Sequence, residues 1–166
     1  ADHWVQDPDV GGGRVIGEVC HFVDYMHALC ASPPTSVFAS RVGRHSSGIT
    51  EDQCSLSLTF GDGSIGTIIY TAEGSSALQK EHFEAHADGM SLVMSDFMET
   101  RTYHNGKSAL FKTAKRDKGF AQEMAQFVQA IEQGLPPVIP FEQIDAVTRA
   151  CLLAVRSLSS GVAYPL

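Results

Sequence analysis

The chain has 166 residues, 43% of them hydrophobic, and a formal net charge of −7 at pH 7. This length suits one domain with a proper hydrophobic core and is short for two domains of ordinary size. The acidic balance argues against a nucleic-acid partner, because binding to phosphates needs clustered Lys and Arg. No apolar run is long enough to span a membrane. We therefore expect a single domain over residues 1–166, with neither a nucleic acid nor a membrane as its partner.

The four cysteines lie at positions 20, 30, 54 and 151, and none belongs to a C-x-x-C pair. The first residues carry no apolar segment of the kind that directs secretion. Reduced thiols in the cytoplasm are the simplest interpretation of this pattern.

The first predicted regular element is a helix. Residues 1–13 contain Pro8 and the triplet Gly11-Gly12-Gly13, which favour an extended arm. Apolar residues then recur with helical spacing, which predicts a helix from about residue 14 to about residue 31, ended by Ser32-Pro33-Pro34. The apolar stripe comprises Ile16, Val19, Cys20, Val23, Met26 and Cys30. His21 falls on the opposite, polar side of this helix.

Alternation of apolar and polar residues predicts strands after the helix, at about 35–42 and 53–60. The stretch Gly61–Gly66 matches the dinucleotide fingerprint G-x-G-x-x-G, but the residues after it favour a strand where the fingerprint requires a helix. We therefore interpret Asp62-Gly63 as a hairpin turn before a strand that reaches Thr71. Further strands are expected at 80–87, 91–97, 99–104 and 107–113, and helices at about 120–133 and 141–159.

This order of elements predicts an α+β fold, with a large, mainly antiparallel, open-faced β-sheet and helices packed on one face. The open face would carry Ile65, Thr67, Ile69 and Thr71. Such a face either stays solvated or pairs with a second subunit.

Several motifs together resemble the C-terminal domain of the Gfo/Idh/MocA oxidoreductases, the family of glucose-fructose oxidoreductase and inositol dehydrogenase. The resemblance covers nearly the whole chain. The motifs are Gly11-Gly12-Gly13 followed by His21-x-x-Asp24, Phe60–Gly66, Asp96-Phe97 and Phe127–Gly134. The run Gly17-Glu18-x-Cys20-His21-Phe22 is most similar to a branch in which this domain can follow a zinc-type alcohol dehydrogenase part.

The resemblance implies the C-terminal, substrate-side and assembly domain of a longer oxidoreductase that acts on a sugar or polyol. NAD or NADP would be bound mainly by an N-terminal Rossmann domain that is absent from this chain and that also supplies a lysine. The chain alone would be inactive, and homo-oligomers would form through the open sheet face. No cofactor-binding residue and no metal ligand of this chain is implied.

The resemblance also implies His21 as the acid-base residue, a role that suits a side chain with a pKa near neutrality, and it places Asp24 beside it. Relatives usually carry an Asp four residues before this His, where this chain has Gly17. The nearest carboxylate, Glu18, is displaced by about 100° on the helix, and whether it replaces the missing Asp is left open. Candidate substrate-binding residues are Arg14 at the helix start, and Trp4 and Tyr25 as rings for a sugar face. Ordinary solvation or packing is the alternative for each of these three.

Two other functional classes stay open. The domain could be a non-catalytic dimerisation or ligand-binding module, which the lack of a carboxylate at Gly17 favours. It could also be a metal-dependent β-sheet enzyme, because His82, Glu84 and His86 would project from one face of a strand. Burial of the alternate residues on the other face explains the same pattern without a metal.

Overall fold

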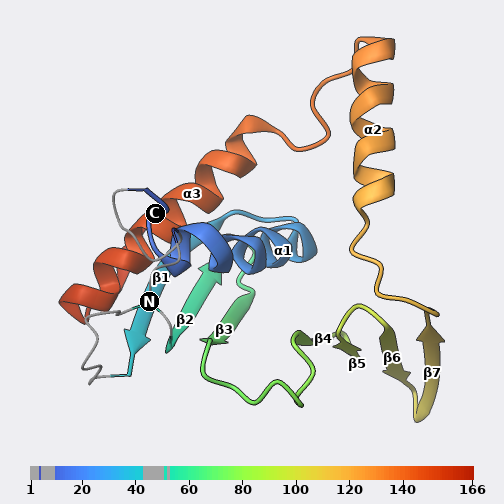
Figure 1. The fold of residues 1–166 in the computed structure, drawn as a ribbon, viewed down its shortest axis with the longest axis horizontal. Helices are drawn as coiled ribbons and strands as arrows, with labels where there is room; N and C mark the ends of the chain where they lie inside the picture. The colour runs from blue at the N-terminus through green and yellow to red at the C-terminus, as the bar shows by residue number, and fades with distance from the viewer. Residues whose placement is uncertain (1–3, 5–9, 43–50, 52) are drawn as a thin grey trace. The chain divides into compact units, whose positions relative to one another are not determined.

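The protein is described by a computed structural model that covers residues 4, 10–42, 51 and 53–166. Most of the arm expected over residues 1–13 lies outside the described residues. The chain folds as two compact units: a first unit formed by the segments 1–73 and 139–166, and a second unit formed by 74–138. Figure 1 shows the ribbon with its elements labelled.

The first unit begins with the predicted helix, which has two parts. The π-helix η2 (Val15–Val19) leads directly into the α-helix α1 (Cys20–Cys30). The helix ends at Ala31, whose φ of 49° is left-handed, just before Pro33 and Pro34 prevent its continuation. The extent of the helix is therefore close to the prediction, whereas the wide π turn at its start was not foreseen.

Four strands form the sheet of the first unit, in the order β3-β2-β1-β8. They are β1 (Pro34–Arg41), β2 (Gln53–Phe60), β3 (Ile65–Thr71) and the two-residue β8 (Tyr164–Pro165). Strands β2 and β3 are antiparallel and joined by a tight turn, in which the Phe60 amide donates to the Ser64 carbonyl at 2.9 Å. Gly63 adopts a φ of 90°, which a residue without Cβ tolerates. The hairpin expected at Asp62-Gly63 is confirmed.

Helices α1 and α3 (Phe141–Ser160) cover one face of this sheet (Figure 1). Helix α3 packs against β1 and against α1, so a single core fills the space between helices and sheet. The most deeply buried core residues come from both helices and from the sheet: Val15, Val19, Val23, Val37, Ala39, Leu56, Leu58, Ala150, Cys151 and Ala154. The other face of the sheet exposes Ile65 and Ile69 of β3.

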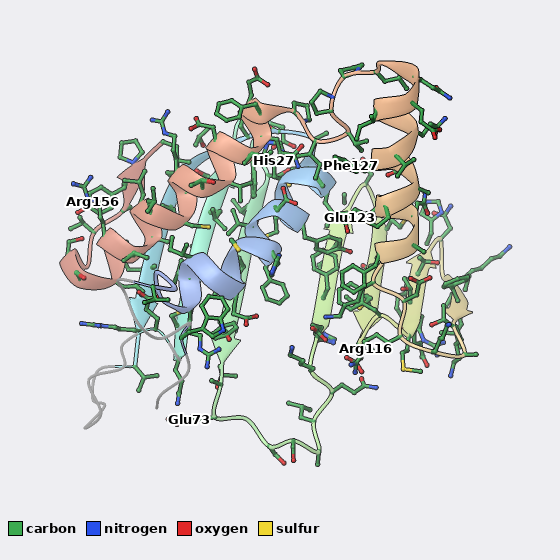
Figure 2. The ribbon with its side chains drawn as sticks, turned by 45° about the horizontal axis from the view of Figure 1, so that its top comes forward. His27, Glu73, Arg116, Glu123, Phe127 and Arg156 are labelled. Carbon is green, nitrogen blue, oxygen red and sulfur yellow. The ribbon has the colours of Figure 1, made fainter. Side chains whose placement is uncertain are left out.

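The second unit is an antiparallel meander followed by a helix. Its sheet has the order β4-β5-β6-β7, with β4 (His82–Ala87), β5 (Met90–Ser95), β6 (Glu99–His104) and β7 (Lys107–Lys112), and α2 (Phe120–Gln133) follows. Apolar side chains of α2, Phe127 among them, are exposed (Figure 2).

The turn between β5 and β6 differs from the prediction. Asp96 and Phe97 were expected within a strand over 91–97, but both have left-handed φ values, 53° and 54°, and form the turn. Polar contacts hold this turn: the Asp96 amide donates to the Glu81 carbonyl at 2.7 Å, and the Arg116 guanidinium pairs with the Asp96 carboxylate. Arg116 lies on the segment between β7 and α2 (Figure 2).

These elements confirm the α+β class and the antiparallel pairing. The strands are hydrogen bonded in two sheets of four, where the sequence pattern led us to expect one large sheet. Within the part of the chain that the structure describes, no helix combines the length and apolarity that crossing a bilayer requires.

Candidate functional site

The start of the His21-bearing helix is fixed by a carboxylate from a distant part of the chain. The backbone amide of Val15 donates a hydrogen bond of 2.9 Å to Oε2 of Glu51. The same carboxylate fills the space that a Cβ would need at Gly13, whose φ is 88°. A glycine is therefore required at this position, and an acidic group at a helix N-terminus is electrostatically favourable. The Val15 amide is thus not available to a ligand beside Arg14.

His21 lies in the first turn of α1 and is exposed, as the helical spacing predicts. No described residue forms a hydrogen bond or an ion pair with its ring. Gly17, four residues earlier, has no side chain to cover the imidazole. The ring is therefore accessible to another molecule.

A groove runs beside His21, between α1 and the start of α3. Its volume is about 160 Å³. Both helices supply apolar and polar side chains to it: Cys20, His21 and Asp24 from α1, and Ile139, Ile144, Val147 and Thr148 from the segment that begins α3. The structure thus brings two of the predicted site residues, His21 and Asp24, to one place.

Asp24 is already engaged at the edge of this groove. The Gln143 side chain donates a hydrogen bond from Nε2 to Oδ1 of Asp24 at 2.9 Å. Thr148 Oγ1 donates to the carbonyl of Ile144 at 2.7 Å, so its oxygen lone pairs are left to accept a hydrogen bond. Sequence reasoning missed Gln143 and Thr148, because no motif marks them and Gln143 contacts a residue 119 positions away.

Glu18 precedes His21 by three residues and lies outside α1. It lies in the π-helix η2, where each turn contains more residues than an α-turn and each residue therefore rotates the chain by less. Glu18 also does not line the groove.

The three predicted substrate-binding residues lie outside the groove lining. Arg14 is partly buried at the start of η2, and Trp4 is 60% exposed. Tyr25 follows His21 by four residues and so shares its side of α1. Burial raises the pKa of the Tyr25 phenol.

The thiols of this region are poor nucleophiles. Burial, followed by the neighbouring charges of Glu18 and Asp24, raises the pKa of Cys20, which lines the groove. Burial raises the pKa of Cys151 to about 12. Because the thiolate is the reactive form, the imidazole is the better candidate for chemistry in the groove.

In the alternative metal site on β4, the acidic residue pairs with both histidines. The Glu84 carboxylate pairs with Nε2 of His82 at 3.0 Å and with Nε2 of His86 at 3.6 Å, and Nδ1 of His86 bonds to Ser91 Oγ at 2.9 Å. The three side chains do share one face, and the hydrogen bond from His82 is the main cause that lowers the pKa of Glu84. Among the described residues, no group of three or more His, Cys, Asp or Glu side chains is placed to hold a metal ion.

Solved structures of dehydrogenases and other oxidoreductases share this fold. A levoglucosan dehydrogenase in complex with NADH and levoglucosan superimposes with a TM-score of 0.84 at 16% identity, covering 99% of this chain and 53% of that one. An aldose-aldose oxidoreductase from Caulobacter crescentus, complexed with glycerol, superimposes with a TM-score of 0.82 at 15% identity, covering 99% of this chain and 51% of that one. A UDP-N-acetylglucosamine 3-dehydrogenase from Acidithiobacillus ferrooxidans superimposes with a TM-score of 0.74 at 18% identity, covering 94% of this chain and 49% of that one. The chain spans about half the length of these structures.

The family follows from the sequence. The profile of the GFO/IDH/MocA C-terminal domain matches residues 1–92, more than half of the chain. The chain therefore belongs to the Gfo/Idh/MocA oxidoreductase family as a C-terminal domain, as the motifs suggested. No curated protein matches the sequence.

Proposed function

We propose that this chain is the substrate-side and assembly domain of an NAD- or NADP-dependent oxidoreductase that acts on a sugar or polyol. Membership of the Gfo/Idh/MocA family supports the reaction class. Solved structures of similar fold that contain levoglucosan or glycerol support the substrate class. The motif Gly17–Phe22 supports the branch that is joined to a zinc-type alcohol dehydrogenase part.

The single observation that carries the proposal is the exposed imidazole of His21 beside a groove. Oxidation of an alcohol to a carbonyl removes a hydride from carbon and a proton from oxygen. The part assigned to this chain is the proton, which His21 accepts from the hydroxyl group. Thr148 adds a second hydrogen-bond acceptor at the same groove.

The glycine loop at 61–66 does not fit the pyrophosphate of a dinucleotide cofactor. The glycines at 61–66 form a hairpin followed by β3, so their amides do not point from a helix N-terminus as a pyrophosphate requires. We therefore assign cofactor binding to an N-terminal nucleotide-binding domain outside this chain, and we expect the chain alone to be inactive.

The size of the groove agrees with an active site that is shared between this chain and a nucleotide-binding domain. Its volume of about 160 Å³ is smaller than that of most ligand pockets, which enclose roughly 300–1,000 Å³. The groove is thus one wall of a site, and the nucleotide-binding domain would supply the other.

The exposed face of β3 supports assembly into a homo-oligomer. Ile65 and Ile69 are 81% and 80% exposed. Thr67 and Thr71 are exposed on the same face, and β3 carries no charged side chain. A second copy of the chain would remove this apolar surface from water.

The free thiols of all four cysteines are consistent with the reducing cytoplasm.

The proposal is tested by comparing the full-length protein with this chain alone. Each is incubated with NAD⁺ or NADP⁺ and with D-glucose, myo-inositol, levoglucosan or glycerol, and formation of the reduced nicotinamide is followed by absorbance. We expect turnover of at least one sugar or polyol by the full-length protein and none by the chain alone. Absence of turnover with every sugar and polyol would contradict the proposal.

Two observations favour a second candidate, a non-catalytic ligand-binding or dimerisation module. The carboxylate expected four residues before His21 is missing at Gly17, and Asp24 is engaged by Gln143. This candidate predicts binding of a sugar or polyol without reduction of either nucleotide in the same assay.

A further inference from the structure

A side-chain hydrogen bond joins the two helices that form the groove. Gln143 lies in the first turn of α3, and Asp24 lies one turn beyond His21 on α1. Gln143 donates from Nε2 to Oδ1 of Asp24 at 2.9 Å, and both side chains are partly buried.

Most of the remaining contact between these helices and the sheet is apolar. The buried side of the His21 helix consists of Val15, Val19 and Val23, and α3 opposes it with residues such as Val147 and Cys151. Apolar packing is not directional, whereas a hydrogen bond requires donor and acceptor at a set distance and angle. The bond from Gln143 to Asp24 therefore fixes the register between the helices at the groove.

We propose that Gln143 is a positioning residue for the His21 site, and that Asp24 serves this site as the acceptor of the Gln143 bond and not as a base. Loss of the bond frees α1 to shift against α3, which moves His21 relative to Ile144, Val147 and Thr148 on the opposite wall. The catalytic part of this inference rests on the proposed function. The structural part, the position of the His21 ring, does not.

Three variants separate the hydrogen bond from the charge. Gln143→Leu removes the donor at similar side-chain size and leaves the Asp24 carboxylate. Asp24→Asn removes the charge and keeps a carbonyl oxygen that accepts from Gln143. Gln143→Glu combined with Asp24→Asn exchanges donor and acceptor and restores the bond. Glu142→Gln is the matched control, because Glu142 is the exposed neighbour of Gln143 on α3.

The first readout is the NMR chemical shift of the His21 imidazole in this chain, with thermal unfolding recorded to confirm that each variant is folded. We expect Gln143→Leu to move the His21 signals, and the Asp24→Asn, exchanged and Glu142→Gln variants to keep them near their original positions. Unmoved His21 signals in folded Gln143→Leu would overturn the proposal. If Gln143→Leu does not fold, the exchanged pair decides: signals that stay in place support positioning, and signals that move contradict it.

The second readout is kcat and KM of the full-length protein with its sugar or polyol. Because a lost hydrogen bond is worth about 0.5–1.5 kcal/mol, we expect Gln143→Leu to lower kcat by up to roughly tenfold with the KM for the nucleotide unchanged. The Glu142→Gln control should stay within about twofold of the original kcat, and Asp24→Asn should lose less than Gln143→Leu because its amide oxygen still accepts from Gln143. An Asp24→Asn loss as large as that of Gln143→Leu would overturn the proposal and make the carboxylate itself the functional group. Absence of turnover in the unmodified protein contradicts the proposed function alone, and the NMR comparison still tests the positioning.

Discussion

Ser157 Oγ accepts a hydrogen bond of 2.8 Å from the backbone amide of Ala39, 118 positions earlier in the chain. Its hydroxyl in turn donates to the carbonyl of Val162 at 2.7 Å, and the side chain is fully buried. Strand β8 pairs with β1 only at Ser36 and Val37, so Ala39 lies beyond the end of β8. Ser157 Oγ therefore supplies the hydrogen-bond acceptor that a longer β8 would have offered to the Ala39 amide.

Replacement of Ser157 by Ala should therefore lower the free energy of unfolding by about 1–3 kcal/mol, because a buried amide loses its acceptor. Urea denaturation of the chain measures this change. Ser159→Ala, an exposed serine two positions along the same helix, is the control and should change stability by less than about 0.5 kcal/mol. Equal midpoints for the two variants would refute the role of Ser157.

Gly66 allows helix α1 to lie close to strand β3. A Cβ at this position would come within 2.5 Å of Sδ of Met26 and 3.5 Å of Cε2 of Phe60. Gly66→Ala should cost roughly 1 kcal/mol, the lower end for overpacking, because the end of the Met26 side chain can move. Thermal unfolding checks the value.

A double-mutant cycle shows whether Met26 is the cause. With Met26→Ala already present, Gly66→Ala should be close to neutral, since the clashing sulfur is gone. Gly74→Ala is the matched control, because nothing lies within 4 Å of its added Cβ. A cost at Gly66 that persists without the Met26 sulfur would show that the close approach has another origin.

The ion pair between Arg116 and Asp96 makes a pH-dependent prediction for the second unit. The hydrogen bond from Arg116 is the main cause that lowers the pKa of Asp96 below its ordinary value. A lowered pKa in the folded state stabilises the fold above the unfolded pKa of about 3.9, and this contribution is lost as the pH falls through the folded pKa. NMR titration of the Asp96 carboxyl carbon measures the effect directly.

In the unmodified chain the Asp96 midpoint should lie below about 3.9, and in Arg116→Gln it should rise. Arg101→Gln is the control, because Arg101 pairs with Glu99 and not with Asp96. An Asp96 midpoint that is identical in the Arg116→Gln variant would show that the guanidinium does not set it.

Local patterns were sufficient for most elements of the fold. Helical spacing gave α1, alternation gave β1 and β2, and Asp62-Gly63 gave the hairpin, because each signal lies within a few residues. Tertiary contacts decided the rest. Asp96-Phe97 reads as a strand by composition, but contacts from Glu81 and Arg116 hold it as a turn. The two-residue β8 has too little sequence to show any pattern.

The buried face of α3 was predicted only in part. Helical spacing over 141–159 predicts a buried face of Ile144, Val147, Cys151, Leu152 and Val155. Val147 and Cys151 are buried, whereas Ile144 and Leu152 are about half exposed. Small residues at Ala150, Ala154 and Ser157 occupy the interface instead, which lets α3 approach β1 closely. A prediction based only on large apolar residues therefore placed the buried face of α3 slightly off its true position.

The candidate site divides in the same way. The outward direction of His21 follows from spacing along one helix, and the family motif marks it together with Asp24. The groove wall from α3 and the bond from Gln143 depend on how two distant helices pack, and no local pattern contains this information. The π turn that contains Glu18 has no sequence signal that we recognised.

The most direct test of the central claim is hydride transfer by the full-length protein with His21 replaced by Ala. Reduction of the nicotinamide is followed with a sugar or polyol that the unmodified protein oxidises, and nucleotide affinity is measured in parallel by fluorescence titration. Because His21 is assigned the proton of the reacting hydroxyl, we expect kcat to fall by roughly 10²–10⁴-fold while the nucleotide dissociation constant stays the same. Unchanged turnover in the His21→Ala protein would remove this residue from the site and contradict the account.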